Sequence, residues 1–482
     1  MKRLNNTAFL FTIIVLEGYV VLASELLAIR MTIPFVGSGT DTVCIIIAAV
    51  LMPLAVGYHF GGSFKKKGRN GKYRSIRKKL LMNIIISAAF ILPALSYFLI
   101  QFFFHGLSTL GIENNQIQIT LYCLTFFVIP VFLLGQTVPL VSNYFSKERL
   151  SKITGKMLCF STLGSFCGSI VTTLILMQYL GAHHTASVIL GVLTILTFML
   201  ARKNMTDKVI TMLVIFGLCL MLNSEQMMAS LNIVKNNKYS TIMVMNLDDD
   251  NNVVLKDEGT PHLFINNNDS SKYNVQTTGK HEYVEFAEKI TIEALPEDAE
   301  PKDVLIIGAG GFTFGHNDPK NNYVYIDIDK DLKEISEEYL LKEKLGKNKE
   351  FYPLPARAYL NVTDKKFDII LLDAYLGGLS IPEHLVTLEF FEEIKEHLND
   401  KGVLVCNFIL SPNFNNKLSK NIDNTLRAVF PYLSRHDTHG DYKVWSKSKS
   451  ENSNFMYIYK HYEDLNSNAI MPASNENKAQ VK

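Results

Sequence analysis

The first 224 residues contain seven long apolar runs, and these runs constrain the fold more than any other feature of the sequence. A helix that spans a bilayer needs about 20 mostly apolar residues. The first run is too long, and is followed by too many others, to be a cleaved signal peptide. We therefore predict a multi-pass α-helical membrane domain of six or seven helices over residues 1–224. The candidate spans are Ala8–Ile29, Thr42–Gly62, Leu80–Phe104, Ile119–Val141, Met157–Tyr179, Thr185–Ala201 and Val209–Leu222.

Lysine and arginine are unevenly distributed among the connections between these spans. They cluster at 65–79 and 147–156. The connections that contain neither residue are 37–41, 105–116 and 181–184. Because basic loops stay in the cytoplasm, we expect a cytoplasmic N-terminus in a cell membrane. Seven crossings would put the C-terminal half outside the cytoplasm and six would keep it inside; the short last run, Val209–Leu222, leaves both open.

Small residues within the runs indicate helix packing rather than transport, whereas buried charge can be functional or simply paired. Small residues recur at close to helical spacing in the fifth run and just before it, which is typical of tight helix–helix contacts. They are Gly155, Ser161, Gly164, Ser165, Gly168 and Ser169. Glu25 and Arg30 lie near a helix end, where we expect them to pair with each other or with water.

The C-terminal half is organised around a glycine-rich stretch. Val304–Ile307 has the length of a buried parallel strand and leads directly into Gly308–Gly311. Glycine lets backbone N–H groups approach a ligand closely. A second short strand, Tyr323–Ile326, ends on Asp327, where a carboxylate can accept hydrogen bonds from both ribose hydroxyls. The pattern predicts a nucleoside pocket on a Rossmann-like sheet.

Strands and helices alternate through the rest of this half, which predicts a mostly parallel sheet. A third strand, Phe367–Leu372, ends on Asp373, and ligands of such sheets bind beyond the carboxyl ends of the strands. A hairpin pattern at 240–256 precedes the sheet. The predicted parts are a linker and small β-hairpin subdomain at 225–280, an α/β Rossmann-like nucleoside-binding domain at 281–464, and a disordered polar tail at 465–482. Further expected elements are helices at Glu282–Leu295 and Lys330–Leu345 and strands at Lys443–Ser446 and Phe455–Tyr459.

Charge and cysteine content argue against other classes of protein. A net charge of +2 argues against a nucleic-acid partner. The six cysteines form no CxxC pair and no Cys/His spacing typical of a metal site. His183 and His184 are adjacent in a short connection, but the sequence indicates no third ligand, so we expect no metal there.

Along nearly its whole length the chain resembles the spermidine synthase family of aminopropyltransferases, which share the S-adenosylmethionine-dependent methyltransferase fold. The matching C-terminal segments are VLIIGAGG, YIDID, PARAYL, FDIILLDAYLGGLSIPEHLVTLEFF and LNDKGVLVCNF. The N-terminal half resembles the membrane region fused to some bacterial members, through ELLAIRMTIPFVGSGT and LLGQTVPLVSNYFS. The segment around Asp373 is the most specific of these matches.

The resemblance implies transfer of an aminopropyl group from decarboxylated S-adenosylmethionine to an amine such as putrescine. It implies that Asp373 accepts the proton of the attacking amine, and that the loop after Asp373 gates the amine site. The residues it assigns to the donor are Gly308, Gly310, Gly311, Asp327, Asp329 and Ala356. The residues it assigns to the amine are Tyr283, Glu285 and Tyr375. The expected partners are a small-molecule amine and the lipid bilayer, without nucleic acid or metal, and a homodimer is possible.

Several positions depart from the family pattern and weaken the acidity expected for amine binding. The family has an acid at Gly311, a second aspartate at Leu376, an adenine-binding aspartate at Pro355, a histidine at Val284 and a glutamine at Ser240. Loss of the loop acid would leave room for the carboxylate of intact S-adenosylmethionine. Two alternatives therefore stay open: an S-adenosylmethionine-dependent methyltransferase, or a membrane transporter or sensor that binds a nucleoside or polyamine without turnover.

Overall fold

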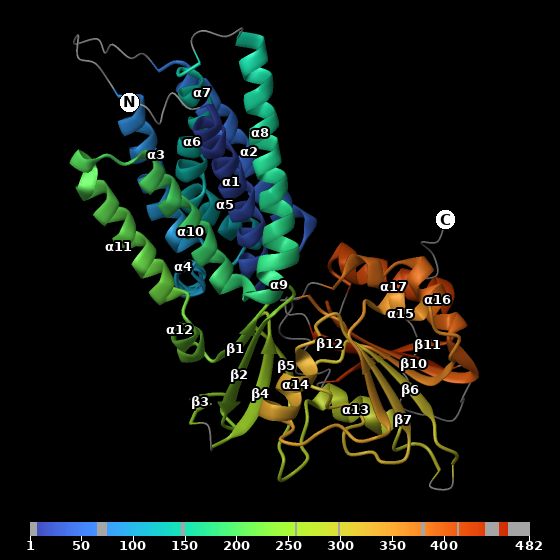
Figure 1. Cartoon of the computed structure of the whole chain (residues 1–482). Coiled ribbons are helices and arrows are strands. Elements are labelled where there is room, and N and C mark those ends of the chain that lie inside the picture. The colour runs from blue at the N-terminus through green and yellow to red at the C-terminus, as the bar shows by residue number, and fades with distance from the viewer. Residues whose placement is uncertain are drawn as a thin grey trace. The chain divides into compact units, whose positions relative to one another are not determined.

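The computed structural model describes residues 7–64, 75–145, 150–255, 258–296, 299–376, 381–411, 414–438 and 453–460. The chain divides into two compact units, Met1–Thr241 and Ile242–Lys482 (Figure 1). The strand expected at Lys443–Ser446, the tail at 465–482 and residues 377–380 of the expected gate loop lie outside the described residues.

The first unit consists mainly of helices. They are α1 (Thr7–Val36), α2 (Thr40–Gly62), α3 (Ile76–Ala94), α4 (Tyr97–Thr109), α5 (Asn115–Phe126), α6 (Val128–Gly135), α7 (Thr137–Ser142), α8 (Leu150–Ile170), a π-helical segment (Val171–Leu176), α9 (Met177–Tyr179), α10 (Gly181–Leu200), a 3₁₀ turn (Lys203–Met205), α11 (Thr206–Leu222) and α12 (Glu225–Ser230), followed by strand β1 (Ile233–Asn236). By length and composition, four helices of the described chain could cross a membrane, or six if α3–α4 and α5–α7 each count as one bent span.

Glycines bring α1 and α8 into backbone contact. Gly164 and Gly168 of α8 lie against the main-chain carbonyls of Val15 and Tyr19, where a Cβ atom has no space. Because residue numbers rise together on both helices, α1 and α8 run parallel. The predicted packing role of the small residues is confirmed for these two positions, whereas Gly155 has open space beside it.

Hydrogen bonds near the helix ends show which ends lie together. At one end, Nη2 of Arg77, at the start of α3, donates to the carbonyl of Ala201, just after α10, at 3.1 Å. At the other end, Nε of Arg30 in α1 donates to the carbonyl of Asn237 at 2.9 Å. Arg30 therefore binds the segment that follows the helices and β1. The sequence did not indicate this contact.

Helices α10 and α11 form an antiparallel pair, which fixes where the chain leaves the unit. Cys219 of α11 lies 3.9 Å from the Oγ of Ser187 in α10, and Glu225 lies 3.1 Å from His184. The described chain thus passes along the unit seven times, in α1, α2, α3–α4, α5–α7, α8–α9, α10 and α11. It leaves at the end opposite to Ser75 and Lys152, which we term the exit end (residues 36–40, 109–115, 179–184 and 223–241).

A small antiparallel sheet opens the second unit. Strand β2 (Thr241–Leu247) pairs with β3 (Val253–Val254) and β4 (Thr260–Ile265). Strand β4 also pairs with β5 (Asn268–Lys272), with an irregularity in register after Leu263. The hairpin expected at 240–256 is therefore present, and α13 (Glu282–Ile290) follows it.

A seven-stranded sheet forms the core of the second unit. Its strands are β6 (Asp303–Ile307), β7 (Asn322–Ile326), β8 (Lys349–Tyr352), β9 (Phe367–Leu372), β10 (Leu398–Leu410), β11 (Leu433–Asp437) and β12 (Ser453–Lys460), in the order β11-β12-β10-β9-β6-β7-β8. The pairs β10–β9, β9–β6, β6–β7 and β7–β8 are parallel, and β12 is antiparallel to both β10 and β11. This is a Rossmann-like sheet of the methyltransferase type. The mostly parallel sheet is confirmed.

The strand order creates a switch point between β6 and β9. The chain moves outward from β6 through β7 to β8, then returns to place β9 on the other side of β6. The intervening and following helical segments are α14 (Leu332–Ile335), a π-helical segment (Ser336–Leu340), α15 (Ala356–Leu360), a 3₁₀ turn (Glu383–Leu385), α16 (Leu388–Glu396) and α17 (Lys417–Val429). Ligands of open α/β sheets bind at such a point, beyond the carboxyl ends of the strands.

Alternate strand residues and helical stripes share one buried cluster. Leu305 and Ile307 of β6 and Ile370 and Leu372 of β9 point to the same face, as the period of two requires. Helix α16 buries Phe390, Phe391 and Ile394 against that face, and α15 and α17 contribute further apolar side chains. This packing fixes the strand ends from which the site is built.

One predicted helix is shorter than expected, and one strand was not predicted. The helix expected over Lys330–Leu345 is α14 and a short π-helical segment, because the carboxylate of Glu337 accepts the N–H of Leu345 at 3.1 Å and turns the chain back. Strand β11 was not expected at all: its sequence, LSRHD, is polar, but Arg435 lies 3.6 Å from the ring centre of Phe455 on β12.

Candidate active site

The glycine loop after β6 is built around a close backbone contact. Gly308 has φ +93° and Gly310 has φ +49°, both in the left-handed region that favours glycine. A Cβ atom on Gly308 would collide with the main-chain carbonyl of Asp373. The loop after β6 and the end of β9 therefore lie in direct backbone contact, as the strand order predicts.

Asp327, at the end of β7, is held by main-chain donors. Its Oδ2 accepts the N–H of Ala309 at 3.2 Å and its Oδ1 accepts the N–H of Asp329 at 2.9 Å. Burial raises the pKa of Asp327 to about 7, although these backbone hydrogen bonds oppose the shift. Its carboxylate is thus positioned over the glycine loop, where ribose hydroxyls could donate to it.

Asp373 follows β9 and is oriented by both neighbouring strands. Its N–H donates to the carbonyl of Ile307 at 2.8 Å, and Nδ2 of Asn407 on β10 donates to its Oδ1 at 2.9 Å. Burial raises the pKa of Asp373, while Asn407 and the hydroxyl of Tyr283 act in the opposite direction. The side chain can therefore take up a proton more readily than an exposed aspartate.

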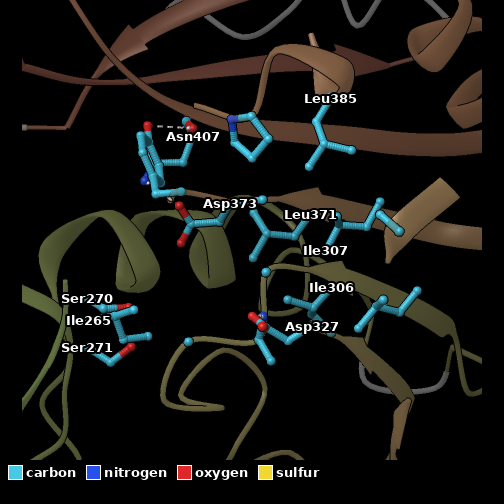
Figure 2. A pocket seen from close by; sticks show the side chains of 18 of the residues that line it. Ile265, Ser270, Ser271, Ile306, Ile307, Asp327, Leu371, Asp373, Leu385 and Asn407 are labelled. Carbon is cyan, nitrogen blue, oxygen red and sulfur yellow. Dashed lines mark hydrogen bonds between the residues drawn. The ribbon is translucent and has the colours of Figure 1, made fainter. Parts of the chain in front are cut away.

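These carboxylates line one cavity of about 350 Å³ at the switch point (Figure 2). In Figure 2, Asp373 and Asp327 lie at the ends of β9 and β7, the two strands that flank β6, and Ser270 and Ser271 lie across from them. The predicted site residues that line the cavity are Gly308, Gly310, Asp327, Ala356, Asp373, Tyr283 and Tyr375. The structure thus brings together residues from α13, β6, β7, α15 and β9.

Three of the predicted site residues, Gly311, Asp329 and Glu285, do not line this cavity. The N–H of Gly311 donates to Oγ of Ser271 at 2.8 Å, and the space for a Cβ at Gly311 is filled by Ser271 and Leu340. The room expected beside this glycine for a substrate carboxylate is therefore taken by protein. Asp329 is buried and accepts the N–H of Asp331 at 3.1 Å at the start of α14. Glu285 accepts the N–H of Lys280 at 2.9 Å, so its carboxylate fastens a loop instead of facing the cavity.

A family comparison bears on this geometry. Residues 284–437 match the model of the spermine/spermidine synthase domain. This region is thus similar to a spermine/spermidine synthase domain. The matched range contains both strand-end aspartates and the glycine loop.

Curated relatives that match this part of the chain are named polyamine aminopropyltransferases. That of Vibrio vulnificus is 33% identical over 149 residues, which are 30% of this chain and 48% of that protein. The "probable polyamine aminopropyl transferase" of Bifidobacterium longum is 30% identical over 141 residues, 28% of this chain and 30% of that protein. The chain thus spans less than half the length of either relative.

Solved structures with a similar fold include spermidine synthases. A probable spermidine synthase from Corynebacterium glutamicum has a TM-score of 0.39 at 18% identity, covering 48% of this chain and 81% of that one. A spermidine synthase in complex with the transition state analogue AdoDATO has a TM-score of 0.37 at 16% identity, covering 48% and 75%.

The cavity also contains residues that the sequence did not indicate. Ser270 and Ser271 come from β5 and Asn407 from β10. His384, for which the sequence left a helix-cap and a gate-loop role open, also lines the cavity from the turn before α16. Asp327 and Asp373 were predicted because each directly follows the carboxyl end of a predicted parallel strand. These other residues do not occupy such positions. Only the fold of the hairpin against the sheet brings β5 to the cavity.

A histidine–aspartate–histidine cluster lies in the wall of the synthase cavity. Asp269, which lines the cavity, accepts hydrogen bonds from Nδ1 of His262 at 2.8 Å and from Nε2 of His281 at 3.1 Å. Burial alone would raise the pKa of Asp269, but the two imidazoles lower it to about 2. Asp269 therefore adds an ionised carboxylate to a cavity whose family-type acids at Gly311 and Leu376 are absent.

Proposed function

We propose that the second unit transfers an aminopropyl group from decarboxylated S-adenosylmethionine to a small-molecule amine. The observation that carries this proposal is the pair of carboxylates, Asp327 and Asp373, at one cavity on the switch point. The family match over 284–437 supports it, and spermidine synthases use this donor. The curated relatives named above carry the same activity in their names.

For this reaction the protein mainly has to position the attacking amine. The nitrogen lone pair attacks the methylene carbon beside the sulfonium, the C–N bond forms, and the C–S bond breaks with its electron pair on sulfur. Methylthioadenosine leaves, and the new ammonium gives one proton to Asp373. Since the sulfonium is already a good leaving group, alignment of the amine supplies much of the rate enhancement.

The two halves of the cavity have different tasks in this proposal. Gly308, Gly310 and Asp327 hold the nucleoside of the donor. Tyr283 and Tyr375 line the amine side, where the Tyr375 hydroxyl accepts the N–H of Ile409 at 2.8 Å and donates to the carbonyl of Asn407 at 3.1 Å. These tyrosines would shape the amine path without titrating.

Product analysis tests the proposal. The full chain, purified in detergent, is incubated with a panel of di- and polyamines and either decarboxylated or intact S-adenosylmethionine. We expect methylthioadenosine and an aminopropylated amine with the decarboxylated donor. S-adenosylhomocysteine from the intact donor would instead identify a methyltransferase, and binding without either product would identify a sensor or transporter.

We further propose that the first unit spans the cell membrane seven times and that the second unit lies outside the cytoplasm. The support is the direction of the helices: the chain leaves at the exit end, opposite to the basic connections at 65–79 and 147–156. Helix α11 has 17 residues, the short limit for a span. Association of the chain into a homodimer stays a prediction.

A further inference from the structure

Three potential metal ligands from two distant segments converge at the exit end of the first unit. His183 and His184 lie in the first turn of α10, and Glu225 is the first residue of α12. The Nε2 atoms of the two histidines lie 3.2 Å and 3.1 Å from the same carboxylate oxygen, Oε1 of Glu225. The sequence indicated only the histidine pair, because the third group follows about 40 residues later.

The separations match those between ligands of a tetrahedral ion. Zinc binds imidazole nitrogen and carboxylate oxygen at about 2.0–2.2 Å, so neighbouring ligand atoms of a tetrahedron lie about 3.3 Å apart. One ligand atom from each of the three residues lies within 4.8 Å of both others. Small local movements would therefore place all three around one ion.

Hydrogen bonding alone does not satisfy this group. If both rings donate from Nε2 to Glu225, Nδ1 of His183 is buried and has no hydrogen-bond partner among the described residues. An ion at Nε2 would not change the surroundings of this Nδ1, so the ligand separations and the adjacent space are what favour a metal. The ligand atoms also line a cavity of about 250 Å³, in which a further ligand of the ion has space.

The surroundings permit entry from solution. The side chain of Glu225 is 73% exposed and that of His184 is 41% exposed, whereas His183 is buried. Lys235 also lines the cavity but is exposed, so its ammonium can remain in solvent. The donor set of two imidazoles and one carboxylate suits zinc and similar transition metals better than calcium or magnesium, which prefer oxygen ligands.

We propose that His183, His184 and Glu225 form a binding site for a divalent transition metal of the zinc class. The ion would join the start of α10 to the segment that follows α11, and one coordination position would stay open to the cavity. This site is separate from the synthase domain and does not depend on the proposed reaction.

Cobalt titration tests the site. Co²⁺ is added to the full chain, purified in detergent and stripped of metal, and visible absorption is recorded, since tetrahedral Co²⁺ absorbs strongly there. We expect one saturable site per chain, displaced by Zn²⁺. Glu225→Gln and His184→Ala, both at exposed positions, should each weaken Co²⁺ binding by roughly tenfold or more because a ligand is lost.

The second histidine cluster provides the matched control. His281→Asn removes one potential ligand from the His262, Asp269 and His281 group and should leave the cobalt spectrum unchanged. Zn²⁺ should also raise the thermal midpoint of the parent chain, and Glu225→Gln should abolish that shift. Absence of a saturable spectrum, or loss of the spectrum in His281→Asn with retention in Glu225→Gln, would overturn the assignment.

Discussion

Asp373 is the residue on which the proposed chemistry depends most directly. Asp373→Asn keeps the shape of the side chain and removes its capacity to accept a proton. We expect kcat to fall about 100-fold or more, as for loss of a general base, while methylthioadenosine binding stays within about twofold of the parent. Steady-state kinetics and calorimetry would measure the two effects.

The control for this variant lies at the other end of the same strand. Asp364 is exposed just before β9, and Asp364→Asn should leave both quantities unchanged. Full activity in Asp373→Asn would show that another group takes the proton.

Asp327 should make nucleoside binding depend on pH near neutrality. Burial raises its pKa to about 7 from 3.8, and only the ionised carboxylate can accept hydrogen bonds from both ribose hydroxyls. Methylthioadenosine binding should therefore tighten as the pH rises from about 6 to about 8. Asp327→Asn should flatten that dependence and weaken binding at the higher pH, measured by calorimetry.

Ionisation of Asp327 has the opposite effect on the unliganded protein, because it lowers the stability of the fold. Because the folded-state pKa is raised, Asp327 stabilises the fold most below about pH 4, and this contribution is lost as the pH rises through about 7. The decline in unfolding free energy over this window should be smaller in Asp327→Asn. An identical decline in parent and variant would place the titrating group elsewhere, with Asp373, whose pKa is also raised, as the next residue to test.

Asp269 supplies a carboxylate to the cavity, in which the acids of the family pattern at Gly311 and Leu376 are missing. If it contacts the distal ammonium of a diamine, Asp269→Asn should raise the KM for that amine roughly tenfold, the effect of losing a charge-assisted hydrogen bond, with little change in kcat. A monoamine acceptor should be unaffected. Equal losses for both acceptors would mean that Asp269 only supports the hairpin.

At the scale of elements, glycine spacing on α8 makes a paired test possible. Gly164→Ala would press a methyl group onto the carbonyl of Val15, and overpacking of this kind costs about 1–3 kcal/mol. Gly155→Ala, on the same helix but with open space beside it, should be neutral or slightly stabilising. Thermal unfolding in detergent would compare the two, and equal behaviour would argue against the α1–α8 contact.

Elements with strong local patterns could be predicted, and those decided by distant contacts could not. The runs that became β6, β7 and β9 are apolar and end on glycine or aspartate, so Gly308, Asp327 and Asp373 followed from strand order alone. The polar strand β11 depends on Arg435 packing over Phe455, which no local pattern indicates. Ser271, Asn407 and Asp269 reach the cavity only because separate elements fold against it.

At the scale of the whole molecule, the number of crossings determines the compartment of the chemistry. A cysteine introduced at exposed Asp364 should react with a membrane-impermeant maleimide in intact cells, because the second unit is proposed to lie outside the cytoplasm. A cysteine at exposed Lys152, at the opposite end of the first unit, should react only after lysis. Labelling of the parent chain gives the background from native cysteines, and the reverse pattern would indicate six crossings.

The contact between Gly308 and the carbonyl of Asp373 divides the lining of the cavity into a rigid part and an adaptable part. Main-chain atoms are in direct contact there. A substitution that moved the proposed nucleoside-binding loop would therefore also move Asp373, the proposed proton acceptor. The opposite wall, from the β4–β5 hairpin and Tyr375, is made of side chains on separate segments. New acceptors would therefore arise by remodelling that wall, while the nucleoside half stays as it is.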